Sequence, residues 1–266
     1  SGFELQLDGR IIDRAVKWDL GVNFSLNRSK VLVLSEDKDI FGGELDNTIL
    51  KDQLNLMRVG EPMYDFYGYV EDGYDENGHI VYKNMDDDPA ITAADKTIIG
   101  DPNPDFLVNL TTAVSYKGFT LSAFFQSSIG NDIYSLSMAA QAYDYGYNGN
   151  TLREVYYNHW TLENPTAKYP NLDQTSYKMS DRFVYDGSFV RLKNLELAYD
   201  VPCARNKFIK RARVYVSAQN LFTITSYPFW DPDINANGGG SSMIQGVDSY
   251  CYPSARIYTI GCRLTF

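Results

Sequence analysis

The sequence predicts an all-β chain, and within that class a fragment of an antiparallel transmembrane β-barrel with long extracellular loops. Three observations lead to this prediction. Several segments alternate between apolar and polar residues with a period of two, the connections between them are alternately short and long, and no long uninterrupted apolar run is present. Barrel strands show this weak alternating pattern, whereas a membrane-spanning helix needs about 18 or more consecutive apolar residues.

The carboxy-terminal segment, residues 256–266, places its large apolar side chains on one side of a strand and mainly polar ones on the other. The apolar side carries Tyr258, Ile260, Cys262, Leu264 and Phe266. At ~3.3 Å per residue and a tilt of about 45°, the segment spans roughly 25 Å, which is the height of a barrel's apolar band. Tyr258, Ile260, Leu264 and Phe266 are therefore the predicted barrel-assembly signal. These residues alone also fit an edge strand of a soluble sandwich.

Upstream segments repeat the pattern. Residues 3–7 alternate as far as a turn predicted at Asp8-Gly9, and residues 16–27 form the clearest strand with two different sides. Residues 106–116 alternate again and return through a tight turn predicted at Lys117-Gly118. Residues 16–27 and 106–116 are each long enough for a strand that crosses a bilayer.

The next strand, residues 189–199, changes its apolar phase partway along. Val190 and Leu192 share one parity and Leu195 the other, so we predict a β-bulge near Lys193-Asn194. A strand over residues 212–218 follows. The connections between successive strands then run short, long, short, long, short, long, which matches the short periplasmic turns and long extracellular loops of outer-membrane barrels.

Composition limits the function classes. The 266 residues carry a net charge of −10, which argues against nucleic-acid binding. Most of the acidity lies in residues 28–105, predicted to be a long acidic extracellular loop insertion within one barrel portion that covers residues 1–266. The amino-terminal residues show no signal peptide, and the three cysteines predict no disulfide within the chain.

Several short motifs, spread along the whole chain, resemble the SusC/RagA family of TonB-linked outer-membrane transporters. The motifs are Val59-Gly60-Glu61-Pro62, Phe66–Tyr69, Ile99–Phe106, Gly130–Tyr134, Asp186–Asn194, Gln219–Phe222 and Tyr252-Pro253. Each is weak alone, but their number and order make the resemblance specific.

The resemblance implies a barrel portion of about seven strands out of 22. The plug domain and the TonB-contacting segment of the family have no counterpart in this sequence. By resemblance, the complete protein imports oligosaccharides or peptides across the bacterial outer membrane, with a SusD-like surface lipoprotein and energy from TonB. Two alternatives remain open: a passive porin or surface adhesin, and a soluble carbohydrate-binding β-sandwich.

One loop has the spacing of a twelve-residue calcium-binding loop. Its candidate ligands are Asn84, Asp86, Asp88, the carbonyl of Ala90, Thr92 and Asp95. Pro89 occupies the position where glycine is expected, and the alternative is a solvated acidic turn. Calcium is the only cofactor that the sequence predicts.

Six aromatic residues in one predicted loop are candidates for substrate contact, because aromatic faces stack on sugars and peptides. They are Tyr143, Tyr145, Tyr147, Tyr156, Tyr157 and Trp160. The alternative is that they form the core of the loop itself. Tyr116, Phe119 and Tyr199, near strand ends, fit the aromatic girdle at a membrane interface.

No catalytic residues are predicted. His79 and His159 lie in separate loops without a Ser or Cys motif nearby, and Gly238-Gly239-Gly240 lacks the Lys-Ser/Thr of a phosphate-binding loop. We therefore expect a protein that is not an enzyme.

Overall fold

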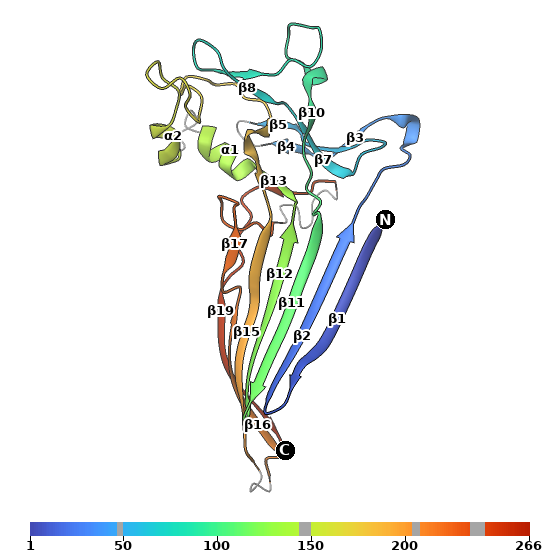
Figure 1. Ribbon diagram of the computed structural model, residues 1–266. Helices are drawn as coiled ribbons and strands as arrows, with labels where there is room; N and C mark the ends of the chain where they lie inside the picture. The colour runs from blue at the N-terminus through green and yellow to red at the C-terminus, as the bar shows by residue number, and fades with distance from the viewer. Residues whose placement is uncertain (47–49, 144–149, 204–207, 235–242) are drawn as a thin grey trace.

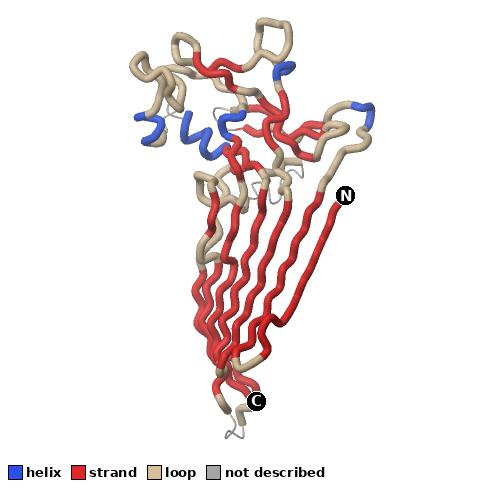
Figure 2. Tube along the Cα trace, in the orientation of Figure 1, coloured by secondary structure: helices blue, strands red, loops and turns tan. Residues whose placement is uncertain are grey.

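The computed structural model describes residues 1–46, 50–143, 150–203, 208–234 and 243–266. A tall curved wall of long strands stands below a cap of loops, short strands and helices (Figures 1 and 2). Both the amino-terminus and the long connections lie at or near the cap end of the wall, while the short turns and the carboxy-terminus lie at the opposite end.

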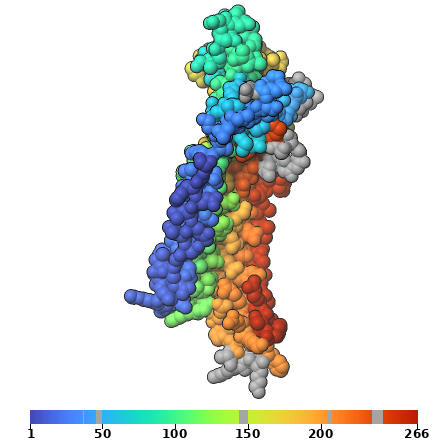
Figure 3. All heavy atoms as spheres, turned by 90° about the vertical axis from the view of Figure 1, so that its right-hand side faces the viewer, coloured from blue at the N-terminus to red at the C-terminus, as the bar shows by residue number. Residues whose placement is uncertain are grey.

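Seven long strands build the wall, and each pairs with its neighbours in the antiparallel sense. In spatial order they are β1 (Gly2–Asp13), β2 (Val16–Asn27), β11 (Phe106–Tyr116), β12 (Phe119–Ile129), β15 (Phe189–Val201), β16 (Arg211–Gln219) and β19 (Ile257–Thr265). The short strand β17 (Thr223–Thr225) also pairs with β15. Figure 3 shows the wall below the cap, with β1 and β19 at its two edges. The all-β fold and the strand number are confirmed.

The strand register aligns apolar side chains into continuous rows on one face of the wall. One row crosses all seven strands: Ile12, Trp18, Val114, Leu121, Leu197, Val216 and Ile260. The row beside it lies on the other face and is mostly polar: Arg10, Asp19, Ala113, Ser122, Glu196, Ser217 and Thr259. The wall therefore has an apolar face and a polar face throughout.

The apolar face is not covered by any other part of the described chain. Val216 is 47% exposed and Ile260 is 87% exposed. The buried hydrophobic cluster lies in the cap instead, around residues such as Leu54, Phe66 and Tyr134. A soluble sandwich would bury its apolar strand face against a second sheet. The soluble alternative is therefore wrong, and the wall is a transmembrane β-barrel portion whose apolar face meets lipid.

The turn expected at Asp8-Gly9 is not formed. Strand β1 continues through these residues, and the connection to β2 falls at Arg14-Ala15. A register shift between Arg10 and Ile12 absorbs the change of apolar phase, and Arg10 Nε donates to Asp19 Oδ1 at 2.8 Å across the strand pair. Because a bulge can accommodate the change of phase, the break in alternation did not require a turn.

Two other predicted irregularities are confirmed. Lys117 and Gly118 both have positive φ and connect β11 to β12 in a two-residue turn of the kind that hairpins favour. In β15 the pairing with β12 passes from Leu192 to Asn194, so Lys193 is the extra residue of a bulge. The bulge keeps both halves of β15 apolar on the same face.

Aromatic side chains lie at both ends of the apolar face. Near the cap, the Phe24 ring is 5.8 Å from that of Phe106 and 6.2 Å from that of Phe3. At the turn end, the Phe119 ring is 4.5 Å from that of Tyr199. This is the girdle arrangement of membrane barrels.

On the polar face near the turn end, the Tyr215 ring lies over Gly261 of the neighbouring strand. The two residues are register partners, and a Cβ added to Gly261 would lie 2.5 Å from Tyr215 Cζ. The glycine is therefore required for the ring to lie flat against β19.

The cap is built from the long connections. Residues 28–105 contribute β3 (Ile40–Phe41), β4 (Glu44–Asp46), β5 (Lys51–Gln53), β6 (Asn55–Met57), β7 (Met63–Gly68), β8 (Glu71–Tyr74), β9 (Ile80–Tyr82), β10 (Thr97–Gly100) and the 3-10 turns η1 (Ser35–Asp37) and η2 (Ala93–Asp95). Arg28 Nη2 and Asp105 Oδ1 form an ion pair of 2.6 Å that joins the two ends of this segment at the top of the wall.

The later connections complete the cap. They contribute β13 (Asp132–Ser135), β14 (Val184–Asp186) and β18 (Val247–Asp248), together with α1 (Leu136–Tyr143), α2 (Arg153–Tyr157) and the 3-10 turn η4 (Asp181–Phe183). Within the residues that the structure describes, no helix has the length and apolar content needed to cross a membrane.

Candidate functional site

A cavity of about 270 Å³ lies where the polar face of the wall meets the cap. The wall contributes Leu107 and Asn109 from β11, Gln126 from β12 and Phe189 from β15. The cap contributes the remaining walls, including Asp132, Ile133, Asp233, Ile234 and Gln245. The cavity therefore opens on the same face that carries the polar rows, at the loop end of the barrel.

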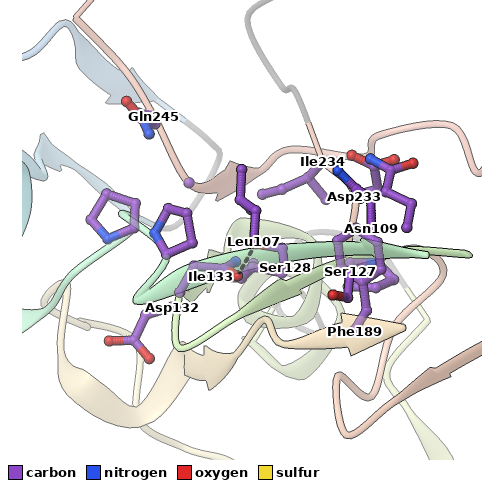
Figure 4. Close-up of a pocket in the computed structure, with 16 residues that line it drawn as sticks. Leu107, Asn109, Ser127, Ser128, Asp132, Ile133, Phe189, Asp233, Ile234 and Gln245 are labelled. Atoms are coloured by element: carbon purple, nitrogen blue, oxygen red, sulfur yellow. Dashed lines mark hydrogen bonds between the residues drawn. The ribbon is translucent and has the colours of Figure 1, made fainter. Parts of the chain in front are cut away.

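The polar side chains of the cavity are amides, carboxylates and the hydroxyls of Ser127 and Ser128, and both hydroxyls donate to other groups of the chain, Val108 O and Asn131 Oδ1. Figure 4 shows Asn109 and Asp233 on the same side of the cavity, whereas the Asp132 side chain points away from it. The Asp132 Oδ2 atom instead accepts a hydrogen bond from the Asp101 backbone at 2.9 Å. The described residues that line the cavity include no Lys, Arg or His.

Two oxygens on this side lack hydrogen-bond donors. The Oδ1 atom of Asn109 is buried and accepts no hydrogen bond from the described chain. Asp233 uses its Oδ2 atom for Arg191, whose Nη1 donates at 3.2 Å, and no described donor binds its Oδ1. A buried acceptor without a donor costs about 1–3 kcal/mol, and this applies to Asn109 Oδ1. The Asp233 side chain is 38% exposed, so its Oδ1 atom carries no such cost.

Arg191 holds the loop behind the cavity. Its side chain is 1% exposed and its guanidinium forms a short ion pair with Asp231. It also donates to Thr223 Oγ1 at 2.9 Å and to Ser254 Oγ at 3.2 Å. Arg191 therefore connects β15 to two distant points of the last long connection.

The candidate calcium residues lie in one loop. The side-chain Oδ1 atoms of Asn84, Asp86 and Asp88 each accept a backbone N–H two residues further on, at 3.1, 2.8 and 3.0 Å. Among the described residues, no three His, Cys, Asp or Glu side chains lie close enough together to hold a metal ion. The loop is thus ordered by its own hydrogen bonds.

Asp95 closes this loop from inside. Its side chain is buried, and its two oxygens accept the Met85 and Thr92 backbone N–H groups, each at 2.7 Å. These hydrogen bonds, Met85 first, lower the pKa of the Asp95 carboxyl. Ala90 contributes its N–H to Asp88.

The aromatic candidates separate into buried and exposed residues. Tyr143 is buried and stacks on Tyr177 with ring centroids 3.8 Å apart, and Trp160 is buried over Gly78, where no side chain would fit. These two residues belong to the core of the cap. Tyr156 and Tyr157 are 60% and 70% exposed and pack edge to face.

The remaining predicted residues are two loop tyrosines, the four residues of the predicted barrel-assembly signal and the cysteines. Tyr145 and Tyr147 lie outside the described residues. Tyr258, Ile260 and Leu264 lie on the apolar face of β19, and Phe266 follows it at the turn end, 71% exposed. All three cysteines lie within the described residues, and none forms a disulfide.

Sequence reasoning missed the cavity and Arg191. Asn109 and Gln126 were recognisable only as polar positions of alternating strands, because Asp233 and Gln245, which line the same cavity, lie more than a hundred residues away. A signal for Arg191 was present, since the Asp186–Asn194 motif contains it, but its acidic partners could not be chosen from so many carboxylates.

Comparison with known proteins identifies the class. No protein-family model matches the chain. A TonB-dependent receptor of Formosa agariphila, named P3, is 31% identical over 287 aligned residues that cover 100% of this chain and 28% of the receptor. The TonB-dependent receptor SusC of Bacteroides thetaiotaomicron is 27% identical, with 100% and 26% covered.

Solved structures agree with the sequence relatives. Structures described as the RagAB peptide transporter and as the RagAB peptide importer in a closed-closed state match 100% of this chain, with TM-scores of 0.81 and 0.82 at 25% identity. The match covers 29% of the RagAB chain in both. The fold is that of a TonB-dependent transporter barrel.

The chain belongs to the SusC/RagA family of TonB-dependent receptors, of which it forms a fragment. It spans about a quarter to a third of the length of the relatives it matches.

Proposed function

We propose that the chain is part of an outer-membrane importer that takes up oligosaccharides or peptides, driven by TonB and covered by a SusD-like lipoprotein. The observation that carries the proposal is the wall itself, which presents a row of apolar side chains to lipid and a polar row to the lumen. Its relatives are named as TonB-dependent receptors and as a peptide transporter. A wall of this kind forms a lumen for a polar substrate only within a complete barrel.

The test is energy dependence. Cells that express the full-length protein are given labelled oligosaccharides and labelled short peptides, with and without a functional TonB. Uptake that stops without TonB supports the importer. Uptake that continues unchanged would identify a passive porin. If no surface lipoprotein co-purifies with the affinity-tagged protein, the proposed SusD-like partner is contradicted.

Among the aromatic candidates that the structure describes, Tyr156 and Tyr157 are exposed and remain available for substrate. We expect the double replacement by alanine to weaken binding of the imported substrate to the full-length protein about tenfold or more, since each stacking contact contributes on the order of 1 kcal/mol. Equilibrium binding to the purified protein measures this. Leu162→Ala, at an 86% exposed site in the same connection, is the control, and equal affinities for both variants would contradict the prediction.

We also propose that the loop from Asn84 to Asp95 binds calcium weakly, with a dissociation constant on the order of 10⁻³ M, as in extracellular modules. Asp86 and Asp88 use their Oδ1 atoms for the loop's own hydrogen bonds. No hydrogen bond to their Oδ2 atoms is formed within the part of the chain that the structure describes, which supports the proposal. Calcium at about ten times that concentration is expected to slow hydrogen exchange of residues 84–95 in the wild type and not in the Asp86→Asn, Asp88→Asn double variant. An unchanged wild-type exchange rate would exclude the site, and magnesium serves as the control.

Tyr258, Ile260, Leu264 and Phe266 are proposed to guide barrel assembly. Their place on the apolar face and at the end of β19, the strand at one edge of the described wall, supports this role.

A further inference from the structure

We propose that the cavity between the wall and the cap is a subsite for a substrate ammonium group, held by Asn109 and Asp233. The proposal rests on the proposed import function, which it narrows to substrates that carry an amine. The observation that supports it is a pair of acceptor oxygens, Asn109 Oδ1 and Asp233 Oδ1, on one side of the cavity (Figure 4), for which the described residues provide no donor.

An ammonium group supplies the donors that these two acceptors lack. It offers three N–H donors and no acceptor. An anionic group would add further acceptors where donors are already lacking, and the described residues that line the cavity supply no cation to neutralise it. Hydrogen bonds from an ammonium to a carboxylate are charge-assisted and about twice as strong as neutral ones.

The neighbouring cations do not cancel this preference. Arg191 is shared between Asp231 and Asp233, and Lys193 Nζ lies 4.0 Å from Asp233 Oδ2. These two basic groups balance the charges of the two carboxylates. Both of their contacts with Asp233 are made to Oδ2, so the described chain leaves Oδ1 without a donor.

The surrounding charge favours the same ligand. Residues 28–105, which lie above the cavity, contain 18 acidic and 7 basic residues, so this segment carries the net negative charge of the chain. Such a field raises the local concentration of cations and their association rate. The apolar lining from Leu107, Ile133 and Phe189 accommodates the carbon chain that bears the amine.

The experiment measures binding of three alanine-based pentapeptide amides to the full-length protein. The first has a free amino-terminus, the second is N-acetylated, and the third is N-acetylated with a lysine in the chain. We expect the free amine to bind about tenfold more tightly than the acetylated peptide, which corresponds to one charge-assisted contact. The third peptide distinguishes a terminal amine from a side-chain amine.

Variants at Asn109 test the location. Asn109→Asp is expected to increase the preference for the amine and Asn109→Leu to abolish it, whereas Gln219→Leu, on the same face but outside the cavity, leaves it unchanged. The gain in the aspartate variant cannot arise from misfolding. Equal binding of amine and acetylated peptides would overturn the subsite.

Binding of neither peptide by a protein that imports an oligosaccharide would also overturn the subsite, but would leave the import function standing. A protein that imports neither class of substrate, yet prefers the amine, would remove the import function and keep the subsite.

Discussion

Replacing Arg191 by methionine is expected to destabilise the loop end of the barrel by about 3–5 kcal/mol, because it leaves Asp231 without its cation in a buried site. Burial opposes ionisation of Asp231, but hydrogen bonds from the Ser254 and Asp233 backbones and from Arg191 outweigh it, so the pKa of this carboxyl lies below its ordinary value. Without the guanidinium, the carboxylate must either take up a proton or draw in water. Both outcomes separate the last long connection from β15.

Hydrogen exchange of residues 223–234 in the full-length protein measures this loss. The matched control is Arg213→Met on the neighbouring strand β16. Arg213 forms ion pairs with Glu196 at 3.4 Å and Asp200 at 3.3 Å that remain partly exposed, so we expect a change below about 1 kcal/mol. Equal effects of the two replacements would show that burial of Arg191 carries no special weight.

The Asp65→Asn variant is expected to stabilise the cap at pH 8 and to have little effect near pH 4. Asp65 is 2% exposed and its Oδ1 atom has no described donor. Burial first, and then the Asp101 and Glu61 carboxylates, raise the pKa of Asp65 to about 7. The folded pKa thus lies above the unfolded value of about 3.9. Protonation therefore stabilises the fold below pH 4, and this contribution is lost as the pH rises to 7.

Above pH 7 the wild type must keep a buried charge, at a cost on the order of 2–4 kcal/mol, which asparagine avoids. Exchange protection of β6 and β7 between pH 4 and 8 checks this difference. Asp75→Asn is the opposite control: hydrogen bonds from the His79 and Asn77 backbones hold the pKa of the exposed Asp75 below its ordinary value. Its ionised form stabilises the loop above pH 4, so its replacement is harmful at pH 8. If the exchange protection of β6 and β7 in the wild type did not change between pH 4 and 8, the raised pKa of Asp65 would be refuted.

The alternating pattern predicted the wall well because successive side chains of a strand between lipid and water face the two environments in turn. The β-bulge at Lys193 could also be predicted from the sequence, since Val190 and Leu197 share a face only if one extra residue lies between them. The turn predicted at Asp8-Gly9 was wrong because a bulge and a turn both interrupt the alternating pattern, so the pattern does not distinguish them.

The cap was far less predictable. The sequence left open whether Tyr143 and Trp160 contact substrate or form the core of the loop, because Tyr177 and Gly78, which bury them, are far away in sequence. The same holds for the cavity, where Asn109 lies on the same side as Asp233, which is 124 residues further along the chain. Such contacts depend on how separate connections pack against one another, and the alternation of residues within one segment does not predict them.

The Tyr215 ring over Gly261 limits how the final strand can be seated when the barrel closes. If β19 moved by two residues along β16, Thr259 or Arg263 would come beneath the ring, and their Cβ atoms would collide with it. A movement by one residue would turn Ile260 into the water-filled interior. The pair therefore fixes the stagger of the last strand, and through it the shear number that sets the diameter of the complete barrel.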